Sequence, residues 1–203
     1  MKITVTRFKT PEACLKDLER FIRNGRHLHT GRPFKRFGGL RSRELLANWL
    51  ICAVINSCRS TPSLTFTSDH QGGDGILYDM DTKAWRPTEH VMVPRAAPDE
   101  AHDIATLIVN AISKKQAKGT AYASGKILIV FLEAGLGAWF PNRVARQLPK
   151  VDFEDVWVVG LYRVVADEYV YGVTRLDLSS DHAPIGLVRI NKTFDAWEVK
   201  RLQ

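Results

Sequence analysis

Two carboxylates near the middle of the chain have a spacing that suits a metal site. Asp74 and Glu89 flank a segment of alternating residues, which predicts a β-hairpin with Asp81-Thr82 as its tight turn. In that register Asp74 lies opposite Glu89, and Tyr78 lies opposite Trp85. Two like charges directly opposed across a hairpin are destabilising unless a cation lies between them.

A hard divalent cation such as Mg²⁺ or Mn²⁺ fits between two carboxylates, because it prefers oxygen ligands. Such an ion can generate a hydroxide nucleophile and stabilise phosphoryl oxygens, so the chemistry expected is phosphodiester hydrolysis. The alternative is that Asp74 belongs to a polar turn and Glu89 to a solvated strand face. A looser turn would also shift the register and separate the two side chains.

The elements around the hairpin predict an α/β fold with a central mixed β-sheet flanked by helices. Hydrophobic periodicity indicates helices over 43–57, capped by Ser42, and over 99–118. Residues 127–132 form a continuous apolar run, which is typical of a central strand covered on both faces. The strands expected in this region are 64–67, 74–80, 84–93 and 127–132.

The two ends of the chain extend this pattern. The N-terminal part predicts an edge strand over 2–8, a helix from the Thr10 cap to Asn24-Gly25, and a loop or mobile arm over 26–40. The C-terminal part predicts a short helix over 141–148, a buried strand over 156–161, and a closing strand pair over 168–177 and 184–190. We expect one domain over 1–203, made of a basic segment (1–41), a core (42–132) and strands that complete the sheet (133–203).

The hairpin resembles that of a known superfamily. Residues 72–79 followed by 87–93 are similar to the core hairpin of PD-(D/E)XK, or restriction-endonuclease-like, nucleases. That superfamily places an Asp at the start of one strand and an acidic-x-Lys triplet on the next. Residues 42–46 resemble its first core helix, and 104–118 with 125–130 resemble its later helix and core strand. The resemblance implies a restriction-endonuclease-like core and a divergent, Mg²⁺-dependent nuclease.

The resemblance also implies roles for individual residues. Asp74 and Glu89 would be metal ligands, and Glu44 an auxiliary acid; Glu44 also suits the first helical turn, where its charge complements the helix dipole. The superfamily's lysine position holds Val91, so either the lysine function has moved or the site is inactive. Lys115 is the candidate for a moved lysine because it lies on the apolar stripe of its helix; the alternative is a lysine that extends to solvent at the helix end.

His90 is a third candidate metal ligand. Because it alternates with Glu89, we expect it on the opposite face of the sheet, where a packed histidine is the alternative. His70 and Gln71 precede the glycine pair and could approach the same metal or substrate.

Basic residues are concentrated at the start of the chain. Residues 1–43 hold 12 Lys and Arg against 3 Asp and Glu, whereas the remaining residues hold 17 against 19. A charge field of this kind favours a polyanion such as nucleic acid, although a solvated face is the simpler alternative. The candidate nucleic-acid contacts are Arg26, Arg32, Lys35, Arg36, Arg41 and Arg43.

Several classes of function are not supported. No run approaches the roughly 20 apolar residues of a membrane helix, and the first residues lack signal-peptide features, so a cytoplasmic protein is expected. The three cysteines are odd in number and lack zinc-knuckle or redox spacing. No phosphate loop and no serine-hydrolase elbow occur.

The sequence therefore predicts a divalent-metal-dependent nuclease that acts on DNA or RNA. One alternative is an inactive module of the same fold that binds nucleic acid or a protein partner. Another is a small-molecule enzyme that uses Asp74, Glu89 and His90 differently. Nucleic acid is the expected partner, no membrane is expected, and a homodimer stays an open alternative.

Overall fold

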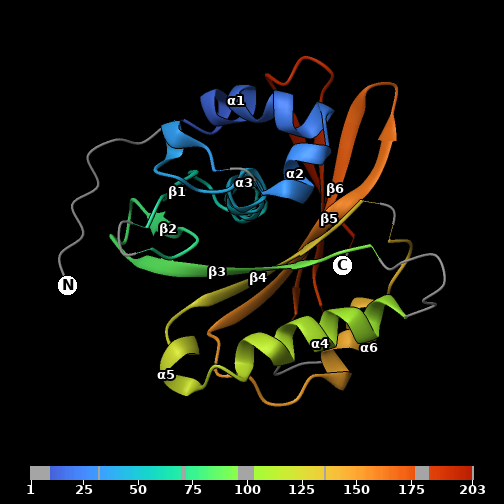
Figure 1. The fold of residues 1–203 in the computed structure, drawn as a ribbon. Helices are drawn as coiled ribbons and strands as arrows, with labels where there is room; N and C mark the ends of the chain where they lie inside the picture. The colour runs from blue at the N-terminus through green and yellow to red at the C-terminus, as the bar shows by residue number, and fades with distance from the viewer. Residues whose placement is uncertain are drawn as a thin grey trace.

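An eight-stranded sheet, with its strands in the order β1 to β8, forms the centre of the molecule (Figure 1). The structure is a computed structural model that describes residues 10–31, 33–69, 72–95, 103–134, 136–176 and 183–202. Strands β3, β4 and β5 pair in parallel and their neighbours pair antiparallel, so the sheet is mixed, as predicted. The strands are β1 (Leu64–Thr67), β2 (Ile76–Asp79), β3 (Trp85–Val93), β4 (Ile127–Leu132), β5 (Asp155–Val165), β6 (Glu168–Leu176), β7 (Ile185–Ile190) and β8 (Trp197–Arg201).

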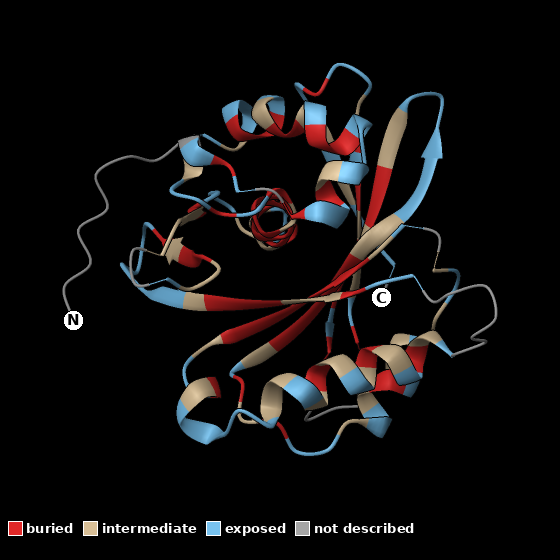
Figure 2. Cartoon of the chain, viewed as in Figure 1, coloured by how far each residue is buried: buried red, intermediate tan, exposed pale blue. Residues whose placement is uncertain are grey.

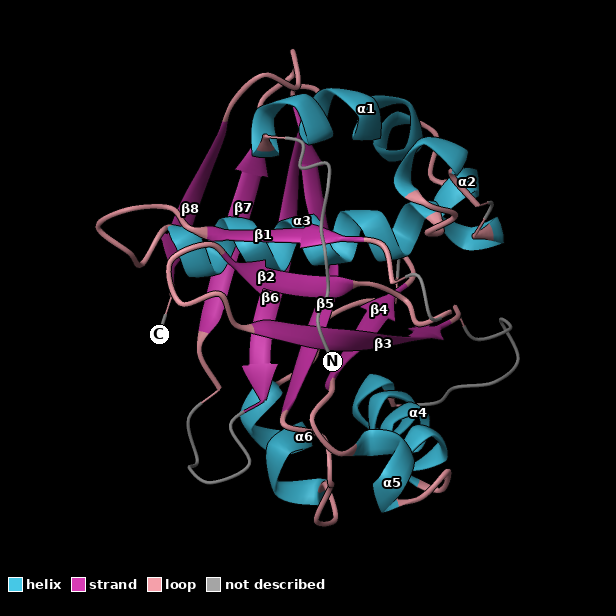
Figure 3. Cartoon of the chain, turned by 90° about the vertical axis from the view of Figure 1, so that its left-hand side faces the viewer, coloured by secondary structure: helices cyan, strands magenta, loops and turns pink. Residues whose placement is uncertain are grey.

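Helices cover both faces of this sheet (Figure 1). One face carries α1 (Pro11–Arg23), α2 (Arg26–Thr30) and α3 (Ser42–Asn56), and the other carries α4 (Ile104–Gln116), α5 (Thr120–Ala123) and α6 (Pro141–Gln147). The sheet is curled, and β1 to β3 run steeply across the direction of β5 to β8 (Figure 3). Within the described parts of the chain, no helix combines the length and the apolar character needed to cross a bilayer.

Helix α3 is the central element of the first face. Nearly all of its residues are buried, and the curled sheet surrounds it (Figure 2). Leu45 and Leu50 have no exposed surface, and the indole nitrogen of Trp49 donates to the carbonyl oxygen of Pro11 at 2.9 Å. A helix that is apolar on most sides is stable only when it is enclosed in this way.

Strand β4 separates the two hydrophobic cores. Its alternate side chains point to opposite faces, so Ile129 packs in the core around α3 while Leu128 and Val130 pack in the core beneath α4. From α4, Ile108 and Ile112 enter that second core and are fully buried. The prediction of a central strand covered on both faces is confirmed.

The segment 26–40 differs from the predicted loop or mobile arm. It contains α2 and a 3₁₀ turn at Lys35–Phe37, and it packs on the first core through three buried side chains. These are Leu28, Phe34 and Leu40, whose apolar character outweighs the glycines and prolines around them. The predicted strand over 2–8 lies outside the described residues.

Some element ends and two short elements also differ from the prediction. Ser42 is not the cap of α3: it lies in the first turn and its hydroxyl donates to the His27 carbonyl oxygen at 2.7 Å, while Arg41 occupies the N-cap position. Helix α4 begins at Ile104, after its N-cap Asp103, and the predicted start at 99 lies outside the described residues. Strand β8 and the four-residue helix α5 are additional elements, because short segments give little periodic signal.

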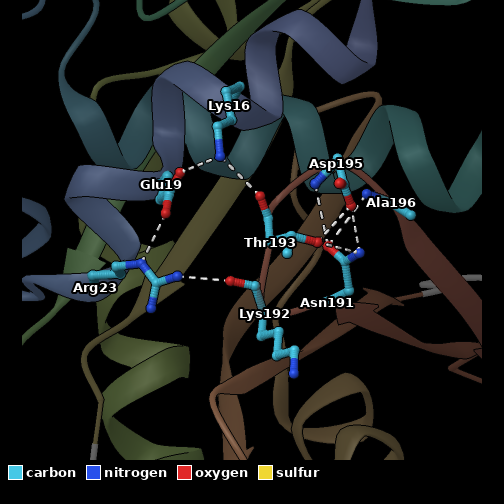
Figure 4. A network of polar contacts seen from close by, with 8 residues as sticks. All are labelled: Lys16, Glu19, Arg23, Asn191, Lys192, Thr193, Asp195 and Ala196. Atoms are coloured by element: carbon cyan, nitrogen blue, oxygen red, sulfur yellow. Dashed lines mark hydrogen bonds and ion pairs between the residues drawn. The ribbon is translucent and has the colours of Figure 1, made fainter.

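Part of the N-terminal basic excess has a structural role. From α1, Lys16 donates to the Thr193 carbonyl oxygen at 2.9 Å and Arg23 to that of Lys192 at 2.6 Å, with Glu19 paired to both cations (Figure 4). These contacts attach α1 to the turn between β7 and β8. Lys16 and Arg23 are therefore engaged within the fold rather than directed at a partner.

The enclosure of α3 makes a stability prediction. We expect Leu50→Ala to destabilise the protein by about 2–5 kcal/mol, because it leaves a cavity in the first core. Urea unfolding measures the change, with Met80→Ala, at a position that is 41% exposed, as the control. Equal losses of unfolding free energy in the two variants would contradict the burial of Leu50 in the first core.

Candidate functional site

The candidate site lies where β2 separates from β3. The ladder has the predicted register, with Ile76 opposite Pro87 and Tyr78 opposite Trp85. Its last backbone bond runs from the Thr88 amide to the Gly75 carbonyl oxygen at 2.8 Å. Beyond that point the two strands diverge, and we call this place the fork.

At the fork, Asp74 does not continue the ladder as predicted. Its Oδ2 accepts a 2.7 Å hydrogen bond from the backbone amide of His90, so the Asp74 carboxylate caps the edge of β3. The expected direct opposition to Glu89 across the hairpin is therefore replaced by a side-chain-to-backbone contact. The turn is also longer than Asp81-Thr82, since the Asp79 amide bonds to the Ala84 carbonyl oxygen.

Gly75 gives the chain the conformation that Asp74 requires. Its φ of 136° is one that side-chain-bearing residues rarely adopt. A Cβ at this position would lie 2.6 Å from Asn48 Nδ2 and 3.1 Å from Thr88 Oγ1. Asn48, which is buried in α3, also donates to the Asp74 carbonyl oxygen at 3.3 Å. Helix α3 thus holds the backbone of the fork.

Glu89 lies on the α4 face and is surrounded by donors. Lys115 from α4 is 3.2 Å from its Oε2, Lys126 is 3.0 Å from its Oε1, and the Tyr122 hydroxyl of α5 donates to Oε2. Burial acts to raise the pKa of Glu89, but the hydrogen bonds from Tyr122, Lys126 and Lys115 outweigh it and lower the pKa below its ordinary value. The carboxylate is therefore ionised at neutral pH.

The contacts of Asp74 and Glu89 affect how these carboxylates could bind the expected metal ion. Asp74 and Glu89 supply the hard oxygens that Mg²⁺ takes, so the donor types fit. However, both Glu89 oxygens now accept from lysines, and an ion would replace at least one of those contacts. Within the described ranges, no group of three or more His, Cys, Asp and Glu side chains is arranged to hold a metal ion.

His90 lies on the other face of β3, as its alternation with Glu89 predicts. It is buried, and burial, with the nearby charges of Lys115 and Arg43, lowers its pKa to about 3, so the ring is neutral. The structure thus does not bring the His90 ring together with the Glu89 carboxylate. This geometry separates two of the three candidate metal ligands.

Glu44 lies on this same α3 face and caps a helix. Its Oε2 accepts from the Arg41 backbone amide at 2.8 Å, the first-turn role that the sequence left open. Burial raises the pKa of Glu44, and the charge of Asp74 adds to the rise. The effect of Asp74 indicates that the Glu44 carboxyl lies near the fork.

Buried polar atoms without a protein partner gather around the fork. Among the described residues, they include Asn48 Oδ1, Thr88 Oγ1 and both ring nitrogens of His90. Buried polar groups are usually satisfied by protein, water or an ion. The α3 side of the fork therefore has hydrogen-bonding capacity that the fold itself does not use.

The predicted nucleic-acid contacts are distributed over the segment that packs on α3. Arg26, Lys35 and Arg41 are exposed, whereas Arg43 is partly buried and donates to the His29 carbonyl oxygen at 3.3 Å. Arg32 and the side chain of Arg36 lie outside the described residues, as do His70 and Gln71. The exposed cations stay candidates for a polyanion surface.

The site residues that were not predicted from the sequence are Tyr122, Lys126 and Asn48. A signal for Lys126 existed, since it directly precedes the apolar run of β4 and lies two residues before Leu128, the register partner of Glu89. No comparable signal identified Tyr122, whose helix has only four residues.

Comparison with known proteins adds no assignment. No family model, curated protein or solved structure matches this chain. The chemistry of the fork is therefore the basis for a proposed function.

The backbone conformation of Gly75 predicts how a substitution at this position changes the stability of the protein. We expect Gly75→Ala to destabilise the protein by about 1–3 kcal/mol, because its backbone conformation is strained for alanine and the added methyl group meets Asn48. Thermal unfolding measures the loss, with Gly172→Ala as control, since no atom lies within 4 Å of a Cβ there. An effect no larger than that of the control would show that the fork tolerates a side chain.

The lowered pKa of Glu89 predicts a pH dependence. Its ion pairs stabilise the fold above the ordinary glutamate pKa of about 4.3, and this contribution is lost as the pH falls through the lower pKa of the folded state. We therefore expect Glu89→Gln to reduce stability at pH 7 but much less at pH 3. Urea unfolding at both pH values checks this; a pH-independent difference would contradict it.

Proposed function

We propose that this protein is a divalent-metal-dependent phosphodiesterase of the restriction-endonuclease-like kind that acts on DNA or RNA. The observation that carries the proposal is the contact of Lys115 with Glu89 beside the Asp74 fork. It supplies a lysine amine at the acidic strand even though Val91 occupies the usual position. The order α3, β1, β2, β3, α4, β4 agrees with the helix, hairpin, helix and strand of that superfamily and supports the same proposal.

In this proposal each residue of the fork has a distinct task. Asp74 and Glu89 hold the ion, which when bound supplies a nucleophilic hydroxide and stabilises phosphoryl oxygens. Lys115 offsets negative charge at the phosphate. Glu44 and Asn48 keep the fork in place from α3, while the neutral His90 ring stays on the opposite face from Glu89.

The alternative is a non-catalytic module that binds nucleic acid or a protein partner. One observation favours it: the Glu89 carboxylate is already paired with two lysines and accepts a hydrogen bond from a tyrosine hydroxyl. In that case the same contacts are a structural ion-pair network. The two functions differ in whether an added metal ion can displace a lysine from Glu89.

A cleavage assay separates them. We expect cleavage of single- or double-stranded oligonucleotides in Mg²⁺ or Mn²⁺ that stops in EDTA. Asp74→Asn and Glu89→Gln should each reduce the rate by at least about 100-fold, which corresponds to roughly 2.7 kcal/mol of lost transition-state stabilisation. Lys115→Met should cost about 100-fold, because one donor to the reacting phosphate is lost.

The matched control is Lys114→Met, which changes an exposed neighbour on the same helix. It should leave the rate unchanged. Salt-dependent binding without cleavage in any divalent ion would support the non-catalytic module instead. Cleavage that survives Asp74→Asn would remove the fork from the chemistry.

A further inference from the structure

Three lysines surround the ring of Tyr122 on the α4 side of the fork. The Nζ atoms of Lys118 and Lys126 lie 4.6 Å and 4.3 Å from the ring centroid, and that of Lys115 lies at 5.9 Å. Lys115 and Lys118 also approach the Tyr122 hydroxyl at 3.2 Å and 3.5 Å. We call these four residues the lysine–tyrosine cluster.

The cluster has more positive than negative charge. Two of its three ammonium groups, those of Lys115 and Lys126, pair with the Glu89 carboxylate, whereas Lys118 contacts the Tyr122 hydroxyl. Like charges held close together disfavour one another, and an added anion relieves that repulsion. The side chains of Lys115 and Lys126 are only 16% and 28% exposed, so their attraction to an anion is less screened than at an open surface.

The cluster is separate from the basic N-terminal segment. It is built by α4, the turn after it, α5 and the residue before β4, whereas the elements that carry Arg26 and Arg43, α2 and α3, lie on the other face of the sheet (Figure 1). The charge of Asp74 influences the pKa of Tyr122 on one face and of Arg43 on the other.

We infer that Lys115, Lys118 and Lys126 form a binding site for a phosphate group of the nucleic-acid backbone. This inference rests on the proposed function and adds a substrate contact that the basic segment does not provide. A phosphate oxygen takes the place of Glu89 as the acceptor for Lys115 and Lys126, and Lys118 adds a third positive charge. Lysines bind phosphate as point charges, so three amines around one position suit it without a rigid geometry.

Oligonucleotide binding in EDTA tests the site apart from any cleavage. The test variant is Lys118→Gln with Lys126→Gln, in which Glu89 keeps Lys115 and Tyr122 as partners. The control is Lys114→Gln with Lys192→Gln, which removes the same charge at two exposed positions. A third variant, Arg26→Gln with Arg41→Gln, removes two cations of the basic segment. Thermal melting verifies that all three fold.

Fluorescence anisotropy over a salt series gives the readout. Loss of the contact with this one phosphate should reduce the slope of log K against log salt concentration by up to about 0.7–0.9 for the test variant, with no change for the control. A slope equal to that of the control overturns the phosphate site. In that case, weaker binding by the Arg26/Arg41 variant would still support nucleic-acid binding and thus the proposed function. Absence of binding by the wild-type protein would overturn both the phosphate site and the proposed function.

A second arm distinguishes the backbone from free phosphate. Inorganic phosphate is titrated into the wild-type protein and the test variant by calorimetry. Weaker oligonucleotide binding in the variant supports the backbone as the ligand, whether or not inorganic phosphate binds. Loss of inorganic phosphate binding with unchanged oligonucleotide binding overturns the inference, since the cluster then serves a free anion.

Discussion

The burial of the Glu89 carboxylate is the constraint on which the candidate site depends. An ionised group that is taken out of water must be paired and hydrogen-bonded, or it destabilises the fold. Its three donors come from α4, from α5 and from the residue that enters β4, so the packing of those elements on the second core sets their positions. Core residues such as Ile108 and Ile112, which are fully buried, thus help to fix the positions of the amines.

The fork connects that network to the first core. Gly75 turns the chain out of the β2–β3 ladder, the Asp74 carboxylate then caps the His90 amide, and Asn48 of the enclosed helix α3 holds the Asp74 carbonyl oxygen. The position of Asp74 is therefore set by α3 and that of Glu89 by α4. Because β3 carries contacts from both cores, the two carboxylates are brought into one neighbourhood by elements on opposite faces of the sheet.

The sequence predicted what depends on periodicity and missed what depends on local backbone geometry. The hairpin register and the placement of Lys115 on the apolar stripe follow from repeats of two and of 3.6 residues, and both agree with the structure. The departure of Asp74 from the ladder follows from the conformation of Gly75, which no repeat encodes. Tyr122 belongs to a helix of four residues, too short to show a period. In the segment 26–40, a few buried apolar side chains outweighed the loop-forming residues.

Under the proposed function, metal and phosphate binding are coupled at Glu89. The same carboxylate is the acceptor for the lysines and the ligand for the ion, so each contact with the ion leaves an amine without its partner. A phosphate group supplies that partner, and by linkage the affinity for the ion and the affinity for the substrate then rise together by the same factor. Val91 occupies the usual lysine position, so the amines that would bind the phosphate come from Lys115 of α4 and from Lys126, the residue before β4. A site built in this way would keep Glu89 paired with lysines until a ligand binds, so a carboxylate that is already paired with cations could still serve the proposed metal-dependent reaction.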